Sequence, residues 1–187
     1  MLGRPIYETA RLVLRPAAPD LSPALAAYYR RNRAFLAPFD PVREEGFFTP
    51  EGQRVLLEAE QAQMAADRSY RLYLSLRESP GEIVGLVGLN ELVRGAFQSC
   101  FLGYKLDGGL LDRGYMTEAV REAVRIAFQE LGLHRIEANI MPRNAPSLRV
   151  AEKAGFYHEG LALKYLCING VWEDHIHMVR RSDMDEG

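Results

Sequence analysis

The sequence predicts an α+β fold with a single domain over residues 1–187. Residues 70–106 form three strand-like runs joined by short turns, which is the pattern of an antiparallel meander. Residues 115–131 repeat apolar side chains at helical spacing. Near the C-terminal end, Asn169-Gly170 separates two further strand-like runs and is a strong signal for a hairpin turn. A chain of 187 residues is long enough for one domain with a sizeable core.

The first third of the chain alternates between strand and helix signals. Residues 11–15 alternate in polarity and predict a strand. A Ser-Pro pair begins a predicted helix at residues 22–29, and a Thr-Pro pair begins a second helix at residues 49–67. Residues 32–41 are aromatic and proline-rich and predict a loop or short helix. Their aromatic side chains either close an edge of the core or face a substrate.

The remaining elements follow without any repeat, low-complexity tract or linker. After the meander and the long helix come a strand, a helix with Asn144 as its N-cap, and the C-terminal hairpin. Together with the first strand, this gives about seven strands, at residues 11–15, 71–76, 83–93, 99–106, 135–141, 156–168 and 171–179.

Charge and hydropathy exclude several classes of function. The net charge of −2 and the pI near 6.1 provide no basic field, so we expect no direct nucleic-acid partner. No apolar run approaches the roughly 20 residues that span a bilayer, and the first residues lack the apolar core of a signal peptide. Cys100 and Cys167 lie in apolar, strand-like runs, and nothing demands a disulfide. We therefore expect a reduced, cytoplasmic protein with no membrane partner.

One stretch, Leu106-Asp-Gly-Gly-Leu-Leu-Asp-Arg-Gly-Tyr-Met-Thr-Glu-Ala119, joins a strand to the long helix. The first N–H groups of such a helix, with the positive end of its dipole, face any nearby anion. Arg113 adds a positive charge, and Gly114 lets a ligand approach the backbone closely. The stretch is typical of a pyrophosphate cradle, although many helices begin after a glycine loop without binding any ligand.

Several motifs, distributed over nearly the whole chain, have the spacing of a known family. They are Asn32-Arg-x-Phe-Leu-x-Pro-Phe39, Val93-Arg-Gly95, Leu102-Gly-Tyr104, Gly114-x-Met-x-Glu-Ala119, Met141-Pro-x-Asn144, Gly155-Phe156 and Gly170-x-Trp-x-Asp-His175. Together they resemble the GNAT superfamily of acetyl-CoA-dependent N-acetyltransferases, and within it the RimJ/RimL-type enzymes that acetylate the N-terminal residue of ribosomal proteins. The resemblance implies a GNAT fold, a mixed and mostly antiparallel sheet that is splayed between its fourth and fifth strands and flanked by helices.

The resemblance also implies acetyl-CoA as the cosubstrate and assigns its contacts. The family's pyrophosphate signature falls on residues 111–116, where Leu111, Asp112 and Met116 depart from the usual residues. The backbone amides of residues 113–117 would still hold the phosphates, with Asp112 turned to solvent. A splayed strand would bind the pantetheine amides through its backbone. The implied cofactor-binding residues are Leu102, Tyr104, Leu106, Arg113, Gly114, Tyr115, Met116, Thr117, Asn144 and Ser147.

The thiolate that leaves coenzyme A needs a proton donor. Many GNAT enzymes use a tyrosine that falls here on Ala151, so the usual acid is missing. The RimJ/RimL-type pattern instead presents a serine, which is Ser147. Its hydroxyl either protonates the sulfur or, as is common for a serine in the first turn of a helix, only caps the helix. Asn144 likewise either reaches the pantetheine arm or acts as the N-cap.

The group that accepts a proton from the amine is less clearly indicated. The base position of related enzymes falls near Asn139, which cannot ionise. Glu91, on the central strand, is the candidate base that we select, and Glu137 is the alternative; either carboxylate is otherwise a solvated surface group. His175 and His177 share a strand face, but no third ligand stands at metal spacing, so we predict no metal site.

These features predict an N-acetyltransferase that acts by direct attack of the amine on acetyl-CoA. The expected acceptor is the α-amino group of a ribosomal protein N-terminus, with the ribosome as a candidate partner and a monomer or homodimer as the active form. One alternative is acetylation of a small amine such as an antibiotic, a polyamine or a peptide toxin, because the same scaffold serves many acceptors. Another is an acetyl-CoA-binding ribosome assembly factor with little turnover.

Overall fold

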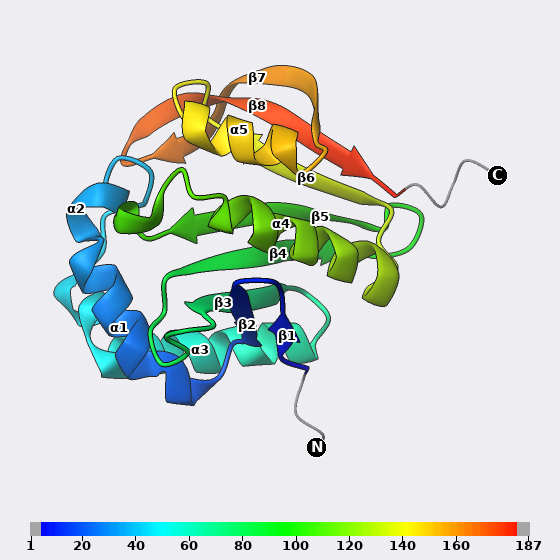
Figure 1. Cartoon of the computed structure of the whole chain (residues 1–187). Helices are drawn as coiled ribbons and strands as arrows, with labels where there is room; N and C mark the ends of the chain where they lie inside the picture. Colours follow the sequence, from blue (N-terminus) through cyan, green and yellow to red (C-terminus); the bar gives the residue numbers. More distant parts are fainter. Residues whose placement is uncertain (1–4, 183–187) are drawn as a thin grey trace.

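The computed structural model describes residues 5–182 and places their strands in one eight-stranded sheet (Figure 1). The order is β1-β2-β3-β4-β5-β6-β8-β7, and all neighbours are antiparallel except β5 and β6, which are parallel. The strands are β1 (Tyr7–Glu8), β2 (Leu12–Pro16), β3 (Tyr70–Leu76), β4 (Gly85–Val93), β5 (Ser99–Leu106), β6 (Arg135–Ile140), β7 (Tyr157–Ile168) and β8 (Val171–Arg181).

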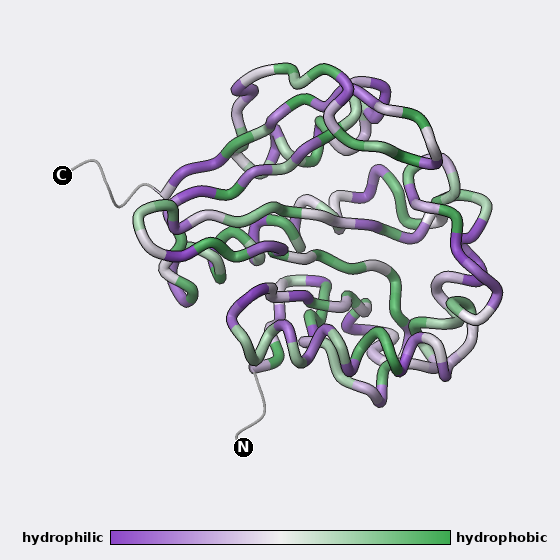
Figure 2. The backbone as a smooth tube through the Cα atoms, turned by 180° about the vertical axis from the view of Figure 1, so that it is seen from behind, coloured by the Kyte–Doolittle hydropathy of each residue, from purple (hydrophilic) through white to green (hydrophobic). Residues whose placement is uncertain are grey.

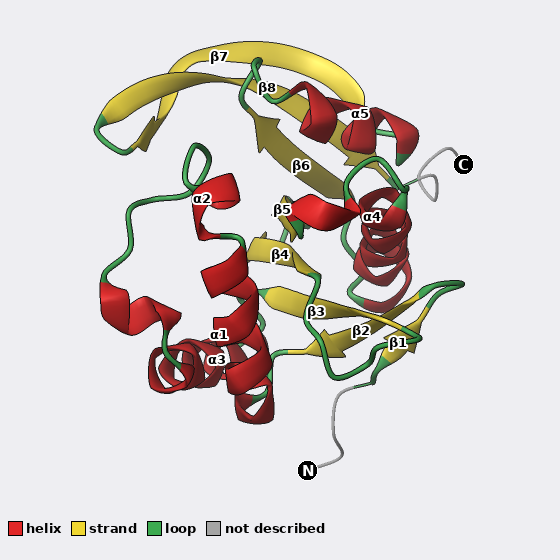
Figure 3. Cartoon of the chain, turned by 60° about the vertical axis from the view of Figure 1, so that its left-hand side comes forward, coloured by secondary structure: helices red, strands yellow, loops and turns green. Residues whose placement is uncertain are grey.

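Helices cover both faces of the sheet (Figure 3). On one face, Tyr73 of β3 donates a hydrogen bond of 2.6 Å to Glu60 of α3. On the other face lie α4 and α5. The helices are α1 (Ser22–Arg31), α2 (Arg33–Leu36), α3 (Pro50–Ala65), α4 (Tyr115–Arg125) and α5 (Ala145–Lys153), with short helices η1 (Pro19–Leu21), η2 (Glu45–Phe48), η3 (Gly108–Leu110) and η4 (Ile126–Glu130). Among residues 5–182, no helix combines the length and the apolar character needed to cross a membrane.

The hydrophobic core lies on both faces of the sheet, beneath α4 on one face and beneath α1 and α3 on the other. Leu14 and Leu74 are paired across β2 and β3, and neither has exposed surface. Val120 of α4 is equally buried. Residues 83–89, which lead into and form most of β4, are buried throughout and read as an almost continuous apolar segment in Figure 2. This pattern is expected for a central strand that is covered on both faces.

The expected α+β class and the expected order of elements are confirmed, with two corrections. The sheet has eight strands rather than about seven, because β1 contains only two residues and is too short to show a period in the sequence. The long helix was expected to continue regularly to Leu131, but its last turn is the π-helix η4, in which the Leu131 N–H donates to the Ile126 carbonyl at 3.0 Å.

The splay of the sheet lies between β5 and β6, which are the fourth and fifth of the strands expected from the sequence. Their pairing is limited to Ser99, Cys100 and Phe101 of β5, opposite residues 135–137 of β6. In neighbouring β4 the register shifts between Asn90 and Val93, opposite this paired part of β5. Such a bulge increases the local twist of a sheet, which favours separation of the strands beyond it.

The Val93-Arg-Gly95 motif has a structural role, which its Arg94 side chain provides. Its guanidinium contacts both carboxylate oxygens of Asp67 at 2.7 Å and donates to the Leu131 carbonyl at 2.6 Å. One side chain therefore fastens the end of β4 to the segment after α3 and to the end of η4.

Candidate functional site

The splay exposes main-chain groups on two strand edges. From Leu102 onward β5 has no pairing partner on its β6 side, and from Ala138 onward β6 has none on its β5 side. The side chains of Leu102 and Leu106 are buried in the core. At these two positions a ligand between the strands can therefore meet only backbone N–H and C=O groups, which form strong hydrogen bonds.

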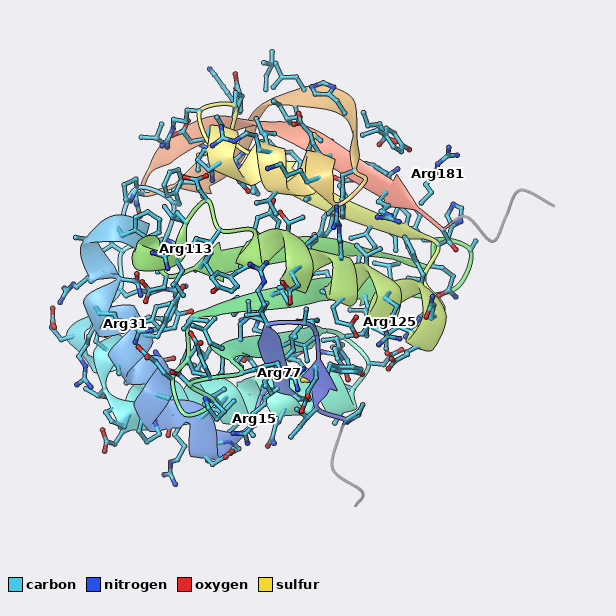
Figure 4. The ribbon with its side chains drawn as sticks, in the orientation of Figure 1. Arg15, Arg31, Arg77, Arg113, Arg125 and Arg181 are labelled. Carbon is cyan, nitrogen blue, oxygen red and sulfur yellow. The ribbon has the colours of Figure 1, made fainter. Side chains whose placement is uncertain are left out.

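The start of α4 offers a second set of unpaired amides. Gly114 adopts the left-handed conformation (φ 79°) and is the N-cap. The first hydrogen bond within the helix runs from the Glu118 N–H to the Gly114 carbonyl at 3.1 Å, so the amides of residues 115–117 have no acceptor inside the helix. The exposed guanidinium of Arg113 lies at this end of α4, and within residues 5–182 it has no hydrogen-bond or ion-pair partner (Figure 4).

The residues that depart from the family signature do not occupy the cradle. The Asp112 side chain is 83% exposed and lies 3.9 Å from Arg149, so its charge is turned to solvent as expected. Met116 is only 5% exposed and packs into the core. The anion that approaches these amides therefore meets neither a carboxylate nor a thioether.

Glu118 anchors the first turn of α4 to the turn between β1 and β2. Its carboxylate accepts hydrogen bonds from the Thr9 hydroxyl at 2.6 Å, from the Arg11 N–H at 2.8 Å and from Arg11 Nε at 2.7 Å. Arg11 also donates to the Arg113 carbonyl at 2.8 Å. Partial burial opposes ionisation of Glu118, but these donors outweigh it and hold its pKa below the usual range.

Asn32 holds the beginning of the loop between β5 and α4 in place. Asn32 is buried at the end of α1, and its side chain accepts from the Gly108 N–H at 3.0 Å and donates to Asp107 at 2.9 Å. Arg31 donates to the same carboxylate at 2.6 Å. A Cβ at Gly108 would lie 3.1 Å from the Phe35 ring, so a larger residue here would require that ring to shift. The loop between β5 and α4 is therefore held in place at both ends.

Tyr104 of β5 and Ser147 of α5 are in contact beside the splay, on the face of the sheet that α4 and α5 cover. The Ser147 hydroxyl donates to the Tyr104 oxygen at 2.9 Å, and the Tyr104 hydroxyl donates to the Ser147 carbonyl at 2.8 Å. Burial raises the pKa of Tyr104 to about 12, although the bond from Ser147 lowers it. Asn144 caps α5 by accepting from the Ser147 N–H at 3.3 Å. The structure thus brings three of the expected site residues together.

On the opposite face of the sheet, the structure separates Glu91 from these groups. Glu91 lies in the bulge of β4 with φ of 50°, and it is exposed. Nearby on β6, the alternative base Glu137 accepts a hydrogen bond of 2.6 Å from His177 Nδ1. Tyr165 of β7 packs against the same imidazole, with ring centroids 4.8 Å apart. No sequence motif predicts this pairing or the proximity of Tyr165.

No cluster of three or more His, Cys, Asp or Glu side chains is placed to hold a metal ion in the described part of the chain. His175 is buried and its Nδ1 lies 3.0 Å from the Glu173 carbonyl. Both cysteines are free, and burial raises the pKa of Cys100 to about 12. Cys100 is therefore a thiol rather than a thiolate near neutral pH, which makes it a poor nucleophile.

Comparison with known families identifies the architecture. The profile described as Acetyltransferase (GNAT) domain matches residues 11–157 of the chain. The Bacillus subtilis protein named Probable N-acetyltransferase YjcK is 47% identical over 144 residues, which are 77% of this chain and 79% of that protein. The chain is therefore similar to a named N-acetyltransferase over most of its length.

Two solved structures share the fold over nearly the whole chain. The ribosomal-protein-S5-alanine acetyltransferase of Vibrio fischeri has a TM-score of 0.90 and 34% identity, covering 96% of this chain and 97% of that chain. Mycobacterium smegmatis RimJ, solved in complex with CoA-disulfide, has a TM-score of 0.86 and 25% identity, covering 94% of this chain and 84% of that chain.

The anchoring of α4 predicts a pH-dependent effect of Glu118→Gln on stability. The substitution removes a charged acceptor with three donors and should lower the free energy of unfolding by about 2 kcal/mol at pH 7. The folded-state pKa of Glu118 is lowered, so its contribution is present above the unfolded pKa of about 4.3 and is lost as pH falls through the folded value. Urea unfolding of both proteins at neutral and acidic pH measures the difference.

As a control for this comparison, Glu152→Gln changes an exposed carboxylate on α5 and should alter stability by no more than about 0.5 kcal/mol at either pH. A deficit of Glu118→Gln that stayed the same from neutral to acidic pH would show that the ionised carboxylate is not the anchor.

Proposed function

Because this chain belongs to the GNAT acetyltransferase family, we propose that it acetylates the α-amino group at the N-terminus of a ribosomal protein. The enzyme is an N-acetyltransferase and uses acetyl-CoA. The acceptor is supported by the similarity to the Vibrio fischeri enzyme, whose name specifies an alanine of ribosomal protein S5. That similarity extends over almost all of both chains, so it includes the elements that surround an acceptor and not only the cofactor loop.

The cradle and the open strand edges would hold acetyl-CoA. The amides of residues 114–117 and the Arg113 guanidinium suit the diphosphate, because they offer several donors and a positive charge to one anion. The unpaired edge of β5, Leu102–Leu106, suits the pantetheine amides in the way that an extended peptide adds to a sheet edge. Tyr104, on the same strand, and Asn144, at the start of α5, both form hydrogen bonds with Ser147.

Acetyl transfer requires a neutral amine and a protonated leaving group. An α-amino group has a pKa of about 8, so an appreciable fraction is neutral near pH 7 and a strong base is unnecessary. The departing thiolate would take its proton from the Ser147 hydroxyl. Tyr104 stays protonated in this pH range, and its oxygen accepts the hydrogen bond of the Ser147 hydroxyl and so orients that hydroxyl.

The opposite face of the sheet offers room for an acceptor chain. A pocket of about 150 Å³ lies among α1, α2 and η2 and is lined in part by Tyr29, Arg33, Phe47 and Asp40. Asp40 is paired at 2.5 Å with Lys105, which lies on β5 at the splayed end. This pocket lies beside the strand edge at which the reaction would occur, so it would hold residues that follow the acceptor amine. It therefore supports a peptide acceptor over a single small amine. On this face Glu91 remains the predicted base.

The acceptor is tested by mass spectrometry of products. A peptide with the N-terminal sequence of ribosomal protein S5, beginning with alanine and containing an internal lysine, is incubated with enzyme and acetyl-CoA. We expect one acetyl group on the α-amine and none on the lysine or on the same peptide with a blocked N-terminus. Preferential acetylation of an amino sugar, a polyamine or a free amino acid would contradict the proposal and favour a small-molecule acceptor.

The cradle predicts that Gly114→Val weakens acetyl-CoA binding by at least about tenfold. The branched side chain would stand over the first amides of α4 and would also be strained at this positive φ. Gly95→Val is the matched control, since Gly95 has φ of 72° and open space around its Cβ position in the turn between β4 and β5. Calorimetric titration should show reduced affinity for the first variant only; equal affinity of both variants would exclude the cradle.

The proton-donor role predicts that Ser147→Ala lowers kcat by about 100-fold with little change in acetyl-CoA affinity, because the hydroxyl acts as the sulfur leaves. Tyr104→Phe should lower kcat less, because it removes only the neighbour of that hydroxyl. Steady-state kinetics with the alanine peptide provide both values. A Ser147→Ala enzyme with unchanged kcat would restrict this residue to capping α5.

A further inference from the structure

We propose that His177, oriented by Glu137, accepts the proton of the substrate amine, and that His177 and Asn139 together form a binding site for a primary ammonium group. This inference rests on the proposed amine acetylation. It assigns the base to a histidine on β8 in place of Glu91 on β4.

The position of these residues follows from the sheet register. Glu137 is the last residue of β6 that pairs with β5, so its side chain stands where the splay begins. Asn139 lies two residues further along β6, directly opposite His177 of β8. Because alternate residues of a strand share a face, all three side chains project from the face that α4 and α5 do not cover. Ser147 lies on the other face, so the proton acceptor and the proton donor would stand on opposite sides of the thioester.

The hydrogen bonds fix the tautomer of the imidazole. Glu137 Oε1 is 2.6 Å from His177 Nδ1, and Glu137 Oε2 accepts from Arg135 at 2.7 Å. Because the Glu137 carboxylate accepts hydrogen bonds from both Arg135 and His177, the neutral imidazole carries its proton on Nδ1 and has a lone pair on Nε2. Among residues 5–182, Nε2 has no hydrogen-bond partner. The pair is largely but not fully buried, with side-chain exposures of 21% for His177 and 13% for Glu137.

Asn139 supplies a second unused acceptor beside the first. Its Nδ2 donates to the Tyr165 hydroxyl at 3.4 Å, while its buried Oδ1 has no hydrogen-bond partner in the described part of the chain. A buried carbonyl oxygen without a donor is costly unless a ligand satisfies it. A primary ammonium group has three N–H donors and a positive charge. Two acceptors on paired positions of β6 and β8, next to the Glu137 carboxylate, match that chemistry.

In the proposed step, His177 Nε2 takes one proton from the ammonium group and passes it to solvent. The neutral amine attacks the thioester carbon, the N–C bond forms and the C–S bond breaks. The nitrogen gives its second proton to solvent, the sulfur takes one from the Ser147 hydroxyl, and Ser147 regains one from solvent. The products are the amide and the free thiol, with one net proton released.

Several other charged or titratable groups surround the imidazole and would influence its titration. Burial and the carboxylates of Glu137 and Glu91 raise the pKa of Tyr165, so its hydroxyl stays protonated and neutral. The groups near His177 are Glu137 with its partner Arg135 on β6, and Glu159 and Tyr165 on β7. His175 on β8 and Glu91 on β4 lie near Tyr165, which packs on the imidazole.

The inference predicts the pH profile of kcat/KM for the alanine peptide. His177→Gln should lower kcat/KM by about 100-fold and remove the histidine limb of the profile, leaving the limb of the amine near about 8. Glu137→Gln should reduce kcat/KM by about tenfold, because the imidazole loses the acceptor that fixes its tautomer and its orientation. His158→Gln, an exposed histidine elsewhere on β7, is the control. Acetyl-CoA affinity should not change in any variant.

Two outcomes of these kinetics would overturn the assignment. One is a His177→Gln enzyme within about threefold of the wild type with the same pH limb. The other is a loss of that limb in Glu91→Gln instead, which would return the base to β4.

A measurement without turnover separates failure of this inference from failure of the proposed function. Nitrogen-15 NMR of the histidine side chains should show His177 as the Nδ1–H tautomer, and addition of the alanine peptide to the enzyme with coenzyme A should shift its Nε2 resonance. A shift with no acetylation of the peptide would retain the ammonium site and reject the proposed acceptor. An unshifted Nε2 would reject the ammonium site even if acetylation occurs.

Discussion

The candidate site depends on one feature of the sheet, which is that the pairing between β5 and β6 stops after a few residues. The two parallel strands share only three residue pairs and then diverge. A longer ladder would satisfy the main-chain groups of both strands and leave nothing for a ligand to bind. The divergence leaves two edges whose N–H and C=O groups need partners, and we propose that the amides of a pantetheine arm provide them. In this proposal the amine and the departing thiolate lie on opposite faces of the sheet.

Contacts around the splay keep β5 and β6 apart and direct the start of α4 toward it. The bulge of β4 twists the sheet beside the last paired residues, and the hydrogen bonds between Tyr104 and Ser147 join β5 to α5 on the helix side. The start of α4 is fastened by Glu118 on one side, and the loop before it is fastened by Asn32 on the other. Folding already orders this loop, so binding does not have to supply that loss of conformational entropy. The diphosphate would therefore bind amides that are already in position.

The local features of this fold were readable from the sequence because each has a local cause. The left-handed Gly114, the cap at Asn144 and the Asn169-Gly170 turn all adopt the conformations that their residue types favour. The contacts that complete the candidate site join distant segments. Glu137 and His177 are 40 residues apart, and Glu118 and Thr9 are 109 apart, so no spacing rule connects them. Glu137 and His177 are brought together by the register of β6 and β8, and Glu118 and Thr9 by the packing of α4 on the sheet. The family resemblance provided the splay, which composition and periodicity do not predict.

The central claim is that free main-chain amides on the edge of β5 and at the start of α4 grip acetyl-CoA. Hydrogen–deuterium exchange of individual backbone amides, with and without coenzyme A, tests it most directly. Amides within residues 102–106 and 114–117 should gain protection together when coenzyme A is added, while those in the turn between β7 and β8 should not change. Protection elsewhere, with these two segments exchanging as before, would contradict the account.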